Sequence, residues 1–170
     1  MSAPDPGSAA SLAGVRTAVT DRLEAWLRET GAPFRLFEHA PVTTSADAAR
    51  VRGTAPEAGA KALVVLAEDR PVHAVLPGNR RLDNARLRAL VGTRTLRFAT
   101  PEELLALTGC APGAVPPFGN LFGLPVLVDD ALAAREDIAF NAGSTAVSIV
   151  MRAADFVRLS GGRVCAFSRA

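Results

Sequence analysis

The order of strand-like and helix-like segments constrains the fold of this chain more than any other feature. Residues 60–67 form an apolar run of strand length, and residues 71–76 follow after the short turn 68–70, which indicates a β-hairpin. Helical periodicity appears between further strand-like runs, but without the strict alternation of a doubly wound parallel sheet. We therefore predict an α/β fold of the α+β kind, with a mixed, partly antiparallel sheet and helices packed around it. The other expected strands are residues 34–37, 96–98, 126–128, 138–141, 145–151 and 163–167, and the expected helices are residues 12–30, 45–51, 83–91, 100–109, 131–134 and 153–159.

Local signals mark the ends of two of these helices. Ser11 can cap the first helix, which carries Trp26 on its apolar stripe, and Gly31 supplies its C-terminal stop. Thr100 and Glu103 have the spacing of a capping box, so a later helix should start there.

The length of 170 residues suits one well-cored domain and is short for two. We expect residues 1–10 to be a disordered N-terminal tail and residues 11–170 to form a single domain that begins with the N-terminal helix. No apolar stretch reaches the roughly 18–20 residues of a membrane span, and the first ten residues lack the features of a secretory signal. These observations predict a cytoplasmic protein without a membrane partner.

The charges are nearly balanced, with 19 basic and 17 acidic residues and a net charge of +2. This balance argues against a nucleic-acid-binding protein held by bulk positive charge, so an RNA partner would have to be held locally. Arginines do cluster within residues 80–97. The cluster could contact phosphates, or it could be the solvated face of a helix.

Lys61 is the one lysine among the nineteen basic residues, and it stands at the head of the apolar run 60–67. A compact ammonium fits narrow pockets better than a guanidinium, and its pKa shifts readily when it is buried. Lys61 could therefore point into a substrate cavity. The alternative is an ordinary solvated residue before a strand.

The segment 109–125 has seventeen residues, which is long for an ordinary loop between secondary-structure elements. It contains four glycines and four prolines, and the prolines make it stiff. Two prolines fix the backbone at the centre of this segment, while the flanking glycines allow tight turns. A rigid loop with exposed amides suits a small polar ligand or a developing oxyanion. A loop that merely covers a sheet edge is the alternative. The candidate binding residues here are Gly113, Ala114, Val115, Pro116, Pro117, Phe118 and Gly119.

A second glycine-containing segment lies between two expected strands, at residues 141–144. Asn141, Gly143 and Ser144 could line a pocket, although an ordinary β-turn has the same composition. Thr44 and Asp129 are further candidates for substrate binding. The interpretation from the residues alone is that either Asp129 or Asp130 caps the short helix that follows them.

Other kinds of chemistry find little support in the sequence. Neither a Gly-x-Ser-x-Gly elbow nor a Walker-type phosphate loop is present. His39 and His73 have no metal-like neighbours, and we interpret both as structural. Cys110 and Cys165 make neither a metal site nor a disulfide framework, and Cys110 suits a small buried apolar position. We expect no metal ion and no organic cofactor.

Several stretches together resemble the YbaK/EbsC family of bacterial aminoacyl-tRNA deacylases, which is related to the editing domain of prolyl-tRNA synthetase. The resemblance covers residues 34–167, and the lysine combined with the Pro-Pro-Phe-Gly loop is its most specific part. The matching stretches are residues 38–44 (EHAPVTT), 61–65 (KALVV), 75–83 (VLPGNRRLD), 108–119 (TGCAPGAVPPFG), 126–129 (VLVD) and 140–143 (FNAG).

The resemblance implies hydrolysis of the ester that joins a wrong amino acid to tRNA, on a mixed sheet curled towards a barrel. Lys61 would hold the aminoacyl carbonyl or the phosphate of the terminal adenosine, and residues 113–117 would present backbone amides and shape the pocket. The attacking group would be water or a group of the substrate. The implied partners are the 3′ aminoacyl-adenosine end of a mischarged tRNA and a synthetase such as the prolyl enzyme, and the protein would be a monomer or a homodimer.

The resemblance constrains the identity of the edited amino acid less than it constrains the reaction. Alanine-specific relatives often carry a histidine where this chain has Asn141, and some carry asparagine where it has Ala62. These departures count against an alanine-type pocket, and they make cysteine, serine or another amino acid at least as well supported as alanine. A non-catalytic module that binds aminoacyl-tRNA, a nucleotide or a synthetase on the same fold is the alternative function, and a stable domain with a vestigial pocket is a third.

Overall fold

A computed structural model describes residues 15–170 of the chain. The tail expected over residues 1–10 and the cap expected at Ser11 lie outside these described residues. Helix α2 (Ala18–Thr30) starts later than expected, because Thr17 adopts an extended conformation and its side chain accepts a hydrogen bond from the backbone N–H of Thr20. Gly31 ends the helix as predicted, with φ 75°.

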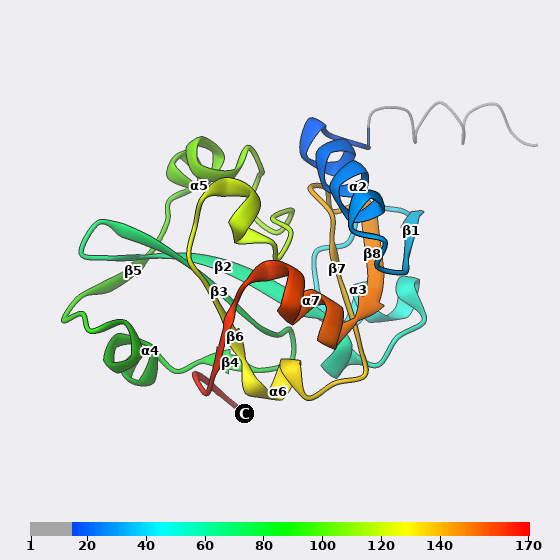
Figure 1. Ribbon diagram of the computed structural model, residues 1–170. Coiled ribbons are helices and arrows are strands. Elements are labelled where there is room, and N and C mark those ends of the chain that lie inside the picture. Colours follow the sequence, from blue (N-terminus) through cyan, green and yellow to red (C-terminus); the bar gives the residue numbers. More distant parts are fainter. Residues whose placement is uncertain (1–14) are drawn as a thin grey trace, which may run out of the picture.

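The predicted hairpin is confirmed and forms the centre of a five-stranded mixed sheet (Figure 1). Strands β2 (Ala60–Ala67) and β3 (Arg70–Pro77) pair antiparallel along their whole length. Glu68 and Asp69 have positive φ values of 51° and 70°, which reverses the chain within two residues. The sheet order is β5-β2-β3-β6-β9, in which β5 (Leu96–Phe98) pairs antiparallel to β2, and β6 (Val126–Asp129) and β9 (Arg163–Cys165) add in parallel.

A three-stranded antiparallel sheet lies beside the first. Its order is β1-β8-β7, from β1 (Phe34–Glu38), β8 (Val147–Arg152) and β7 (Asp137–Asn141). A single parallel bridge between Gly59 and Ala139 joins the two sheets just before β2 begins. Both sheets remain open, so the described residues form a mixed α/β fold without a closed barrel.

The strand expected over residues 163–167 is shorter than predicted. Strand β9 ends at Cys165, and a separate strand β10 (Ser168–Arg169) follows the expected range and pairs with β4 (Arg81–Leu82). The physical reason is the buried carboxylate of Asp129, which accepts hydrogen bonds from the N–H groups of Phe167 and Ser168. These bonds redirect the backbone away from its pairing with β6.

The helices surround the sheets, as expected (Figure 1). Helix α2 places Leu23 and Leu27, both fully buried, into the main apolar core against the β1-β8-β7 sheet. The capping box of Thr100 and Glu103 is present at the start of α5. The remaining helices are α3 (Ser45–Arg52), α4 (Asn84–Val91), α5 (Pro101–Thr108), α6 (Asp130–Ala133) and α7 (Ala153–Ser160), with short 3-10 turns η1 (Pro56–Ala58) and η2 (Gly119–Phe122).

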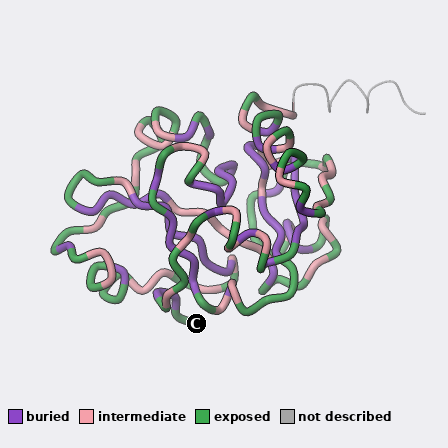
Figure 2. Tube along the Cα trace, viewed as in Figure 1, coloured by how far each residue is buried: buried purple, intermediate pink, exposed green. Residues whose placement is uncertain are grey.

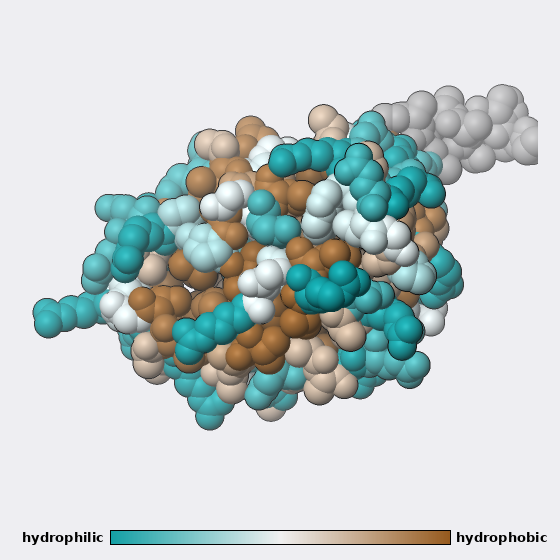
Figure 3. All heavy atoms as spheres, in the orientation of Figure 1, coloured by the Kyte–Doolittle hydropathy of each residue, from teal (hydrophilic) through white to brown (hydrophobic). Residues whose placement is uncertain are grey.

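Phe118 holds the glycine- and proline-rich segment to the core. Its side chain is fully buried and meets the rings of Trp26, Phe140 and Phe156 edge-on, with centroid distances of 5.1, 5.7 and 5.3 Å. Such edge-to-face contacts add to the stabilisation from buried area. Buried residues run along the strands of both sheets in Figure 2, and the face drawn in Figure 3 has hydrophilic residues around its periphery. Among residues 15–170, no helix is long and apolar enough to cross a membrane.

Candidate functional site

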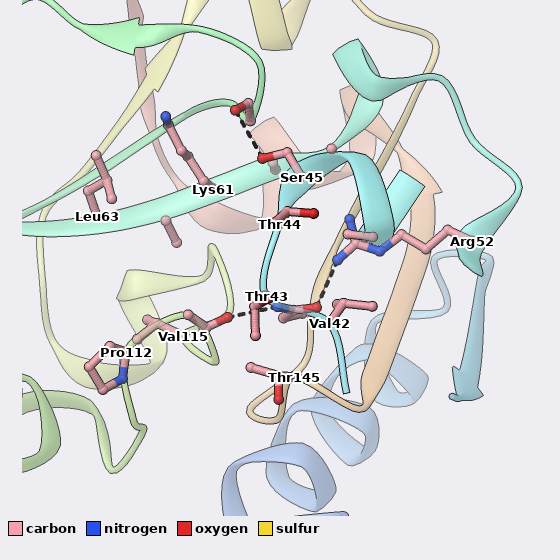
Figure 4. Close-up of a pocket in the computed structure, with 17 residues that line it drawn as sticks. Val42, Thr43, Thr44, Ser45, Arg52, Lys61, Leu63, Pro112, Val115 and Thr145 are labelled. Carbon is pink, nitrogen blue, oxygen red and sulfur yellow. Dashed lines mark hydrogen bonds between the residues drawn. The ribbon is translucent and has the colours of Figure 1, made fainter. Parts of the chain in front are cut away.

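A pocket of about 310 Å³ opens at the junction of the two sheets (Figure 4). This volume is at the small end of the range typical of ligand pockets. Its walls come from the start of β2, the segment that leads into α3, the loop before Phe118 and the end of β7. The lining residues are Val42, Thr43, Thr44, Ser45, Ala48, Arg52, Gly59, Ala60, Lys61, Ala62, Leu63, Gly78, Pro112, Gly113, Val115, Asn141 and Thr145.

Lys61 lies on the β2 wall of the pocket, opposite Leu76 in the hairpin register. Its Nζ donates a hydrogen bond to the carbonyl oxygen of Arg80 at 2.7 Å. Partial burial lowers the pKa of Lys61, and the positive charge of Arg81 lowers it further. The side chain is therefore a partly desolvated cation at a pocket wall, whose remaining donors can face a ligand.

Arg52, at the end of α3, contributes a second cation that the sequence analysis missed. Figure 4 shows Arg52 beside the pocket. Its Nη2 donates to Oδ1 of Asn141 at 2.8 Å, and its Nε donates to Oγ of Ser148 at 2.9 Å. Burial lowers the pKa of Arg52 to about 10. A pKa near this value keeps the guanidinium protonated at neutral pH, and no carboxylate of the described residues pairs with it, so its positive charge beside the pocket is not neutralised.

Asn141 links this cation to the glycine- and proline-rich loop. Its Nδ2 donates to the carbonyl oxygen of Gly113 at 2.7 Å. Gly113 has φ 83°, a conformation that favours glycine, and the turn brings its carbonyl towards β7. The N–H groups of Gly113 and Val115 have no hydrogen-bond partner among the described residues, which leaves two backbone donors in residues that line the pocket.

A second chain of hydrogen bonds runs behind the pocket from Arg52 to His39. Oγ of Ser148 lies 2.7 Å from Nε2 of His39, and Nδ1 of His39 lies 2.8 Å from the carbonyl oxygen of Ala40. Because a carbonyl only accepts, Nδ1 carries the proton and Ser148 donates to Nε2 in the neutral ring. Neither Ser148 nor His39 lines the pocket, so this chain supports Arg52 from behind, which agrees with the structural interpretation of His39.

The structure brings together five of the candidate residues: Thr44, Lys61, Gly113, Val115 and Asn141 all line the pocket. Thr44 has a structural duty as well, because its side chain caps α3 by accepting from the N–H of Asp47. The proximity of these residues could not be read from their spacing, since they come from four separate segments.

The other candidates lie outside the lining of the pocket. The Ala114 carbonyl accepts from the N–H of Gly143, and the backbone at Gly143 packs against Thr17 and Thr20 at the start of α2. Ser144 accepts a hydrogen bond from the N–H of Ala146. The remaining ones are buried in other parts of the molecule: Pro116, Pro117 and Phe118 in the loop, Gly119 against the ring of His73, and Asp129 at the start of α6.

Residues 15–170 contain no group of three or more His, Cys, Asp or Glu side chains that could hold a metal ion. Both cysteines are free thiols. Burial raises the pKa of Cys110, which agrees with a small apolar role for this residue.

Comparison with known proteins adds an independent line of information. A family model described as an aminoacyl-tRNA editing domain matches residues 39–159. The multifunctional Ser/Thr-tRNA deacylase ProXp-y of Escherichia coli strain K12 is 35% identical over 153 residues, which cover 87% of this chain and 92% of that protein. The proline–tRNA ligase of Shouchella clausii is 35% identical over 85 residues, which cover 50% of this chain but only 15% of the ligase.

Solved structures are similar over nearly the whole chain. A structure described as a candidate trans-editing enzyme for prolyl-tRNA synthetase has a TM-score of 0.82 and 28% identity, and the match covers 91% of this chain and 99% of that one. The hypothetical protein APE2540 has a TM-score of 0.80 and 27% identity.

Proposed function

We propose that this chain, which belongs to the family of aminoacyl-tRNA editing domains, hydrolyses the ester bond of mischarged aminoacyl-tRNA. The observation that carries the proposal is the pocket in which Lys61 lies on one wall and the unpaired N–H groups of Gly113 and Val115 belong to another. An ester carbonyl bound between these walls would meet a cation and two backbone donors.

The electrostatics of the pocket suit an anionic transition state. Lys61 and Arg52 both line it, and its lining contains no acidic residue. Water attack on the ester places negative charge on the carbonyl oxygen, and preorganised donors and cations stabilise that charge. The ester is already activated and is held in place by binding, so positioning and charge stabilisation supply the catalysis.

The nucleophile in this proposal is water or a group of the substrate. The lining contains neither histidine nor cysteine, and its hydroxyl groups lack an adjacent general base. Ser45 donates its hydroxyl proton to the carbonyl oxygen of Gly78, and Thr44 is occupied as a helix cap. A covalent acyl-enzyme is therefore not part of the mechanism.

Seryl and threonyl esters are the first substrates to test. The support comes from the ProXp-y relative, described as a Ser/Thr-tRNA deacylase, and from the small polar lining. Thr43, Ser45 and Thr145 surround the pocket with hydroxyl groups, which could hydrogen-bond a substrate hydroxyl. A synthetase, including the prolyl enzyme, is a further partner to test, because part of this chain matches a segment of the proline–tRNA ligases.

The test is a deacylation panel on tRNAs charged with serine, threonine, alanine or cysteine, with acceptors that include tRNA for proline. Wild-type protein should release one or more of these amino acids selectively. Lys61→Ala should lose the activity, and Lys61→Arg should recover little of it because the larger planar cation does not fit the same wall. Arg70→Ala, at the far end of the same hairpin, is the control for loss of one positive charge.

Full activity in Lys61→Ala would contradict the proposed role of the lysine. Retained tRNA or synthetase binding without turnover on any substrate would instead favour the binding-module alternative.

A further inference from the structure

Two arginines lie directly opposite each other on the short strand pair at the C-terminal end of the chain. Arg81 of β4 and Arg169 of β10 are partners in the antiparallel register, so their side chains leave the same face. Figure 1 shows the C-terminal segment beside β4. Both residues are exposed, and neither forms an ion pair within the described part of the chain. Like charges directly opposite on a sheet repel each other, so this pair costs folding stability unless an anion binds there.

Neither arginine lines the pocket, but the strands that carry them are connected to Lys61 on its wall. Arg81 is close enough to Lys61 for its charge to lower the pKa of the lysine. Lys61 also donates to the carbonyl oxygen of Arg80, whose Nε donates to Oγ of Ser168 at 2.7 Å. The lysine wall of the pocket is thereby tied to both strands that carry the exposed arginines.

The position of β10 is held by a buried carboxylate. Oδ2 of Asp129 accepts from the N–H groups of Phe167 and Ser168 at 3.0 and 2.8 Å, and Oδ1 accepts from the hydroxyl of Ser168 at 2.8 Å. The Asp129 side chain is 1% exposed, and its carboxylate accepts hydrogen bonds inside the protein. It is therefore not available to form an ion pair with Arg169. The arginine pair is therefore presented on a fixed strand rather than on a loose terminus.

We propose that Arg81 and Arg169 bind a phosphodiester group of the tRNA acceptor strand as its 3′ end enters the pocket. The planar guanidinium is suited to phosphate because it can donate two parallel hydrogen bonds. A local pair of this kind supplies the attraction that a net charge of only +2 cannot. The match to the family model ends at residue 159, so β10 and Arg169 lie outside the matched range. The proposal rests on the proposed function, since it assigns the phosphate contact of that substrate.

The test measures binding of uncharged tRNA by fluorescence anisotropy at several salt concentrations. The variants are Arg81→Ala, Arg169→Ala and their double variant, and the control is Arg70→Ala, an exposed arginine roughly 20 Å away at the other end of β2 and β3. Loss of the phosphate contact in the double variant should weaken binding and reduce the slope of log affinity against log salt by about 0.7, and each single variant should show part of this change. Arg70→Ala should leave the affinity and the slope at their wild-type values.

Two further measurements separate this proposal from a folding defect and from the proposed function. Arg81→Ala and Arg169→Ala should have melting temperatures equal to or above that of the wild type, because a like-charge pair is removed. Hydrolysis of a small aminoacyl ester without phosphate should be unchanged in both variants at neutral pH, below the alkaline range in which Lys61 loses its proton.

Affinity and salt slope equal to those of Arg70→Ala would overturn the phosphate site even if the wild type deacylates tRNA. Conversely, binding that depends on both arginines in a protein that deacylates no tRNA would support the phosphate site while contradicting the proposed function.

Discussion

Nη2 of Arg52 donates a hydrogen bond to Oδ1 of Asn141 at 2.8 Å, which joins the end of α3 to the end of β7. The opposite side of the same amide donates to the carbonyl oxygen of Gly113. A guanidinium can only donate and a carbonyl can only accept, so the amide has a single orientation that satisfies both. Asn141 thus transmits the position of Arg52 to the loop on the opposite wall of the pocket.

Arg52→Lys should lower kcat/KM for deacylation by about 10- to 100-fold. The substitution removes the hydrogen bond that positions Asn141 and the Gly113 loop, and a small displacement of the groups around a substrate reduces the rate strongly. Lysine keeps the charge but cannot donate to Asn141 and Ser148 in the fork geometry of arginine. The measurement is single-turnover deacylation with melting curves in parallel. Arg50→Lys, an exposed position on the same helix, is the matched control and should retain the wild-type rate.

A double-mutant cycle tests whether the effect passes through Asn141. Asn141→Ala should lose a similar factor, and adding it to Arg52→Lys should cost little more, because both changes break the same connection. Independent, multiplicative losses would show that Arg52 acts by another route.

The deacylation rate should fall at alkaline pH as Lys61 loses its proton. Burial and the charge of Arg81 lower the pKa of Lys61, so its ammonium is neutralised below the ordinary lysine value of 10.5. The rate, corrected for spontaneous ester hydrolysis, should therefore decline before that pH. Arg81→Ala should move the decline to higher pH because a repelling charge is gone. An identical decline in Arg81→Ala would contradict this account of the lysine.

Protonation of His73 should destabilise the fold in mild acid. The ring is fully buried, both nitrogens lack a hydrogen-bond partner among the described residues, and burial lowers its pKa from 6.5 to about 4. Because the folded state binds the proton less readily than the unfolded state, its stability is greatest above pH 6.5. About 3 kcal/mol of stability should be lost as the pH falls from 6.5 through 4.

The measurement is urea unfolding of wild type and His73→Leu between pH 7 and pH 4. Leucine does not titrate, so the free energy of unfolding of the wild type should fall relative to that of the variant. His39→Gln is the control, and it should preserve the pH-dependent difference due to His73. Parallel pH profiles for wild type and His73→Leu would contradict the assignment.

Asp129→Asn should destabilise the protein by about 2 kcal/mol, because the carboxylate accepts three hydrogen bonds from Phe167 and Ser168 within the buried core. Hydrolysis of a small aminoacyl ester per folded molecule should remain at the wild-type level if Asp129 only holds β10. Asp130→Asn, at the exposed neighbouring position, should leave stability unchanged within about 0.5 kcal/mol. A specific loss of ester hydrolysis in Asp129→Asn would instead support the role in substrate binding expected from the sequence.

Most helices and strands could be predicted from the sequence because their signals are local. The apolar run of β2, the capping box at Thr100 and the stop at Gly31 each act within a few residues of the backbone they organise. Helix α2 begins later than predicted because Thr17 caps it, whereas the cap expected at Ser11 lies outside the described residues. Lys61 was identified by its residue type and its place at the head of an apolar strand, and the structure brings it to the pocket.

The tertiary structure decided which side chains meet. Phe118 belongs to the specific loop motif, yet its ring is buried against α2, β7 and α7, while Val115 three residues earlier lines the pocket. Arg52 could not be found from the sequence, because its partners Asn141 and Ser148 lie about ninety residues away. Asp129 likewise accepts hydrogen bonds from the C-terminal strand and does not line the pocket. The sequence by itself determined most of the secondary structure and singled out Lys61, since these depend on local chemistry. Only the tertiary structure decided the composition of the pocket and of the arginine pair, since both arise where segments distant in the chain are packed together.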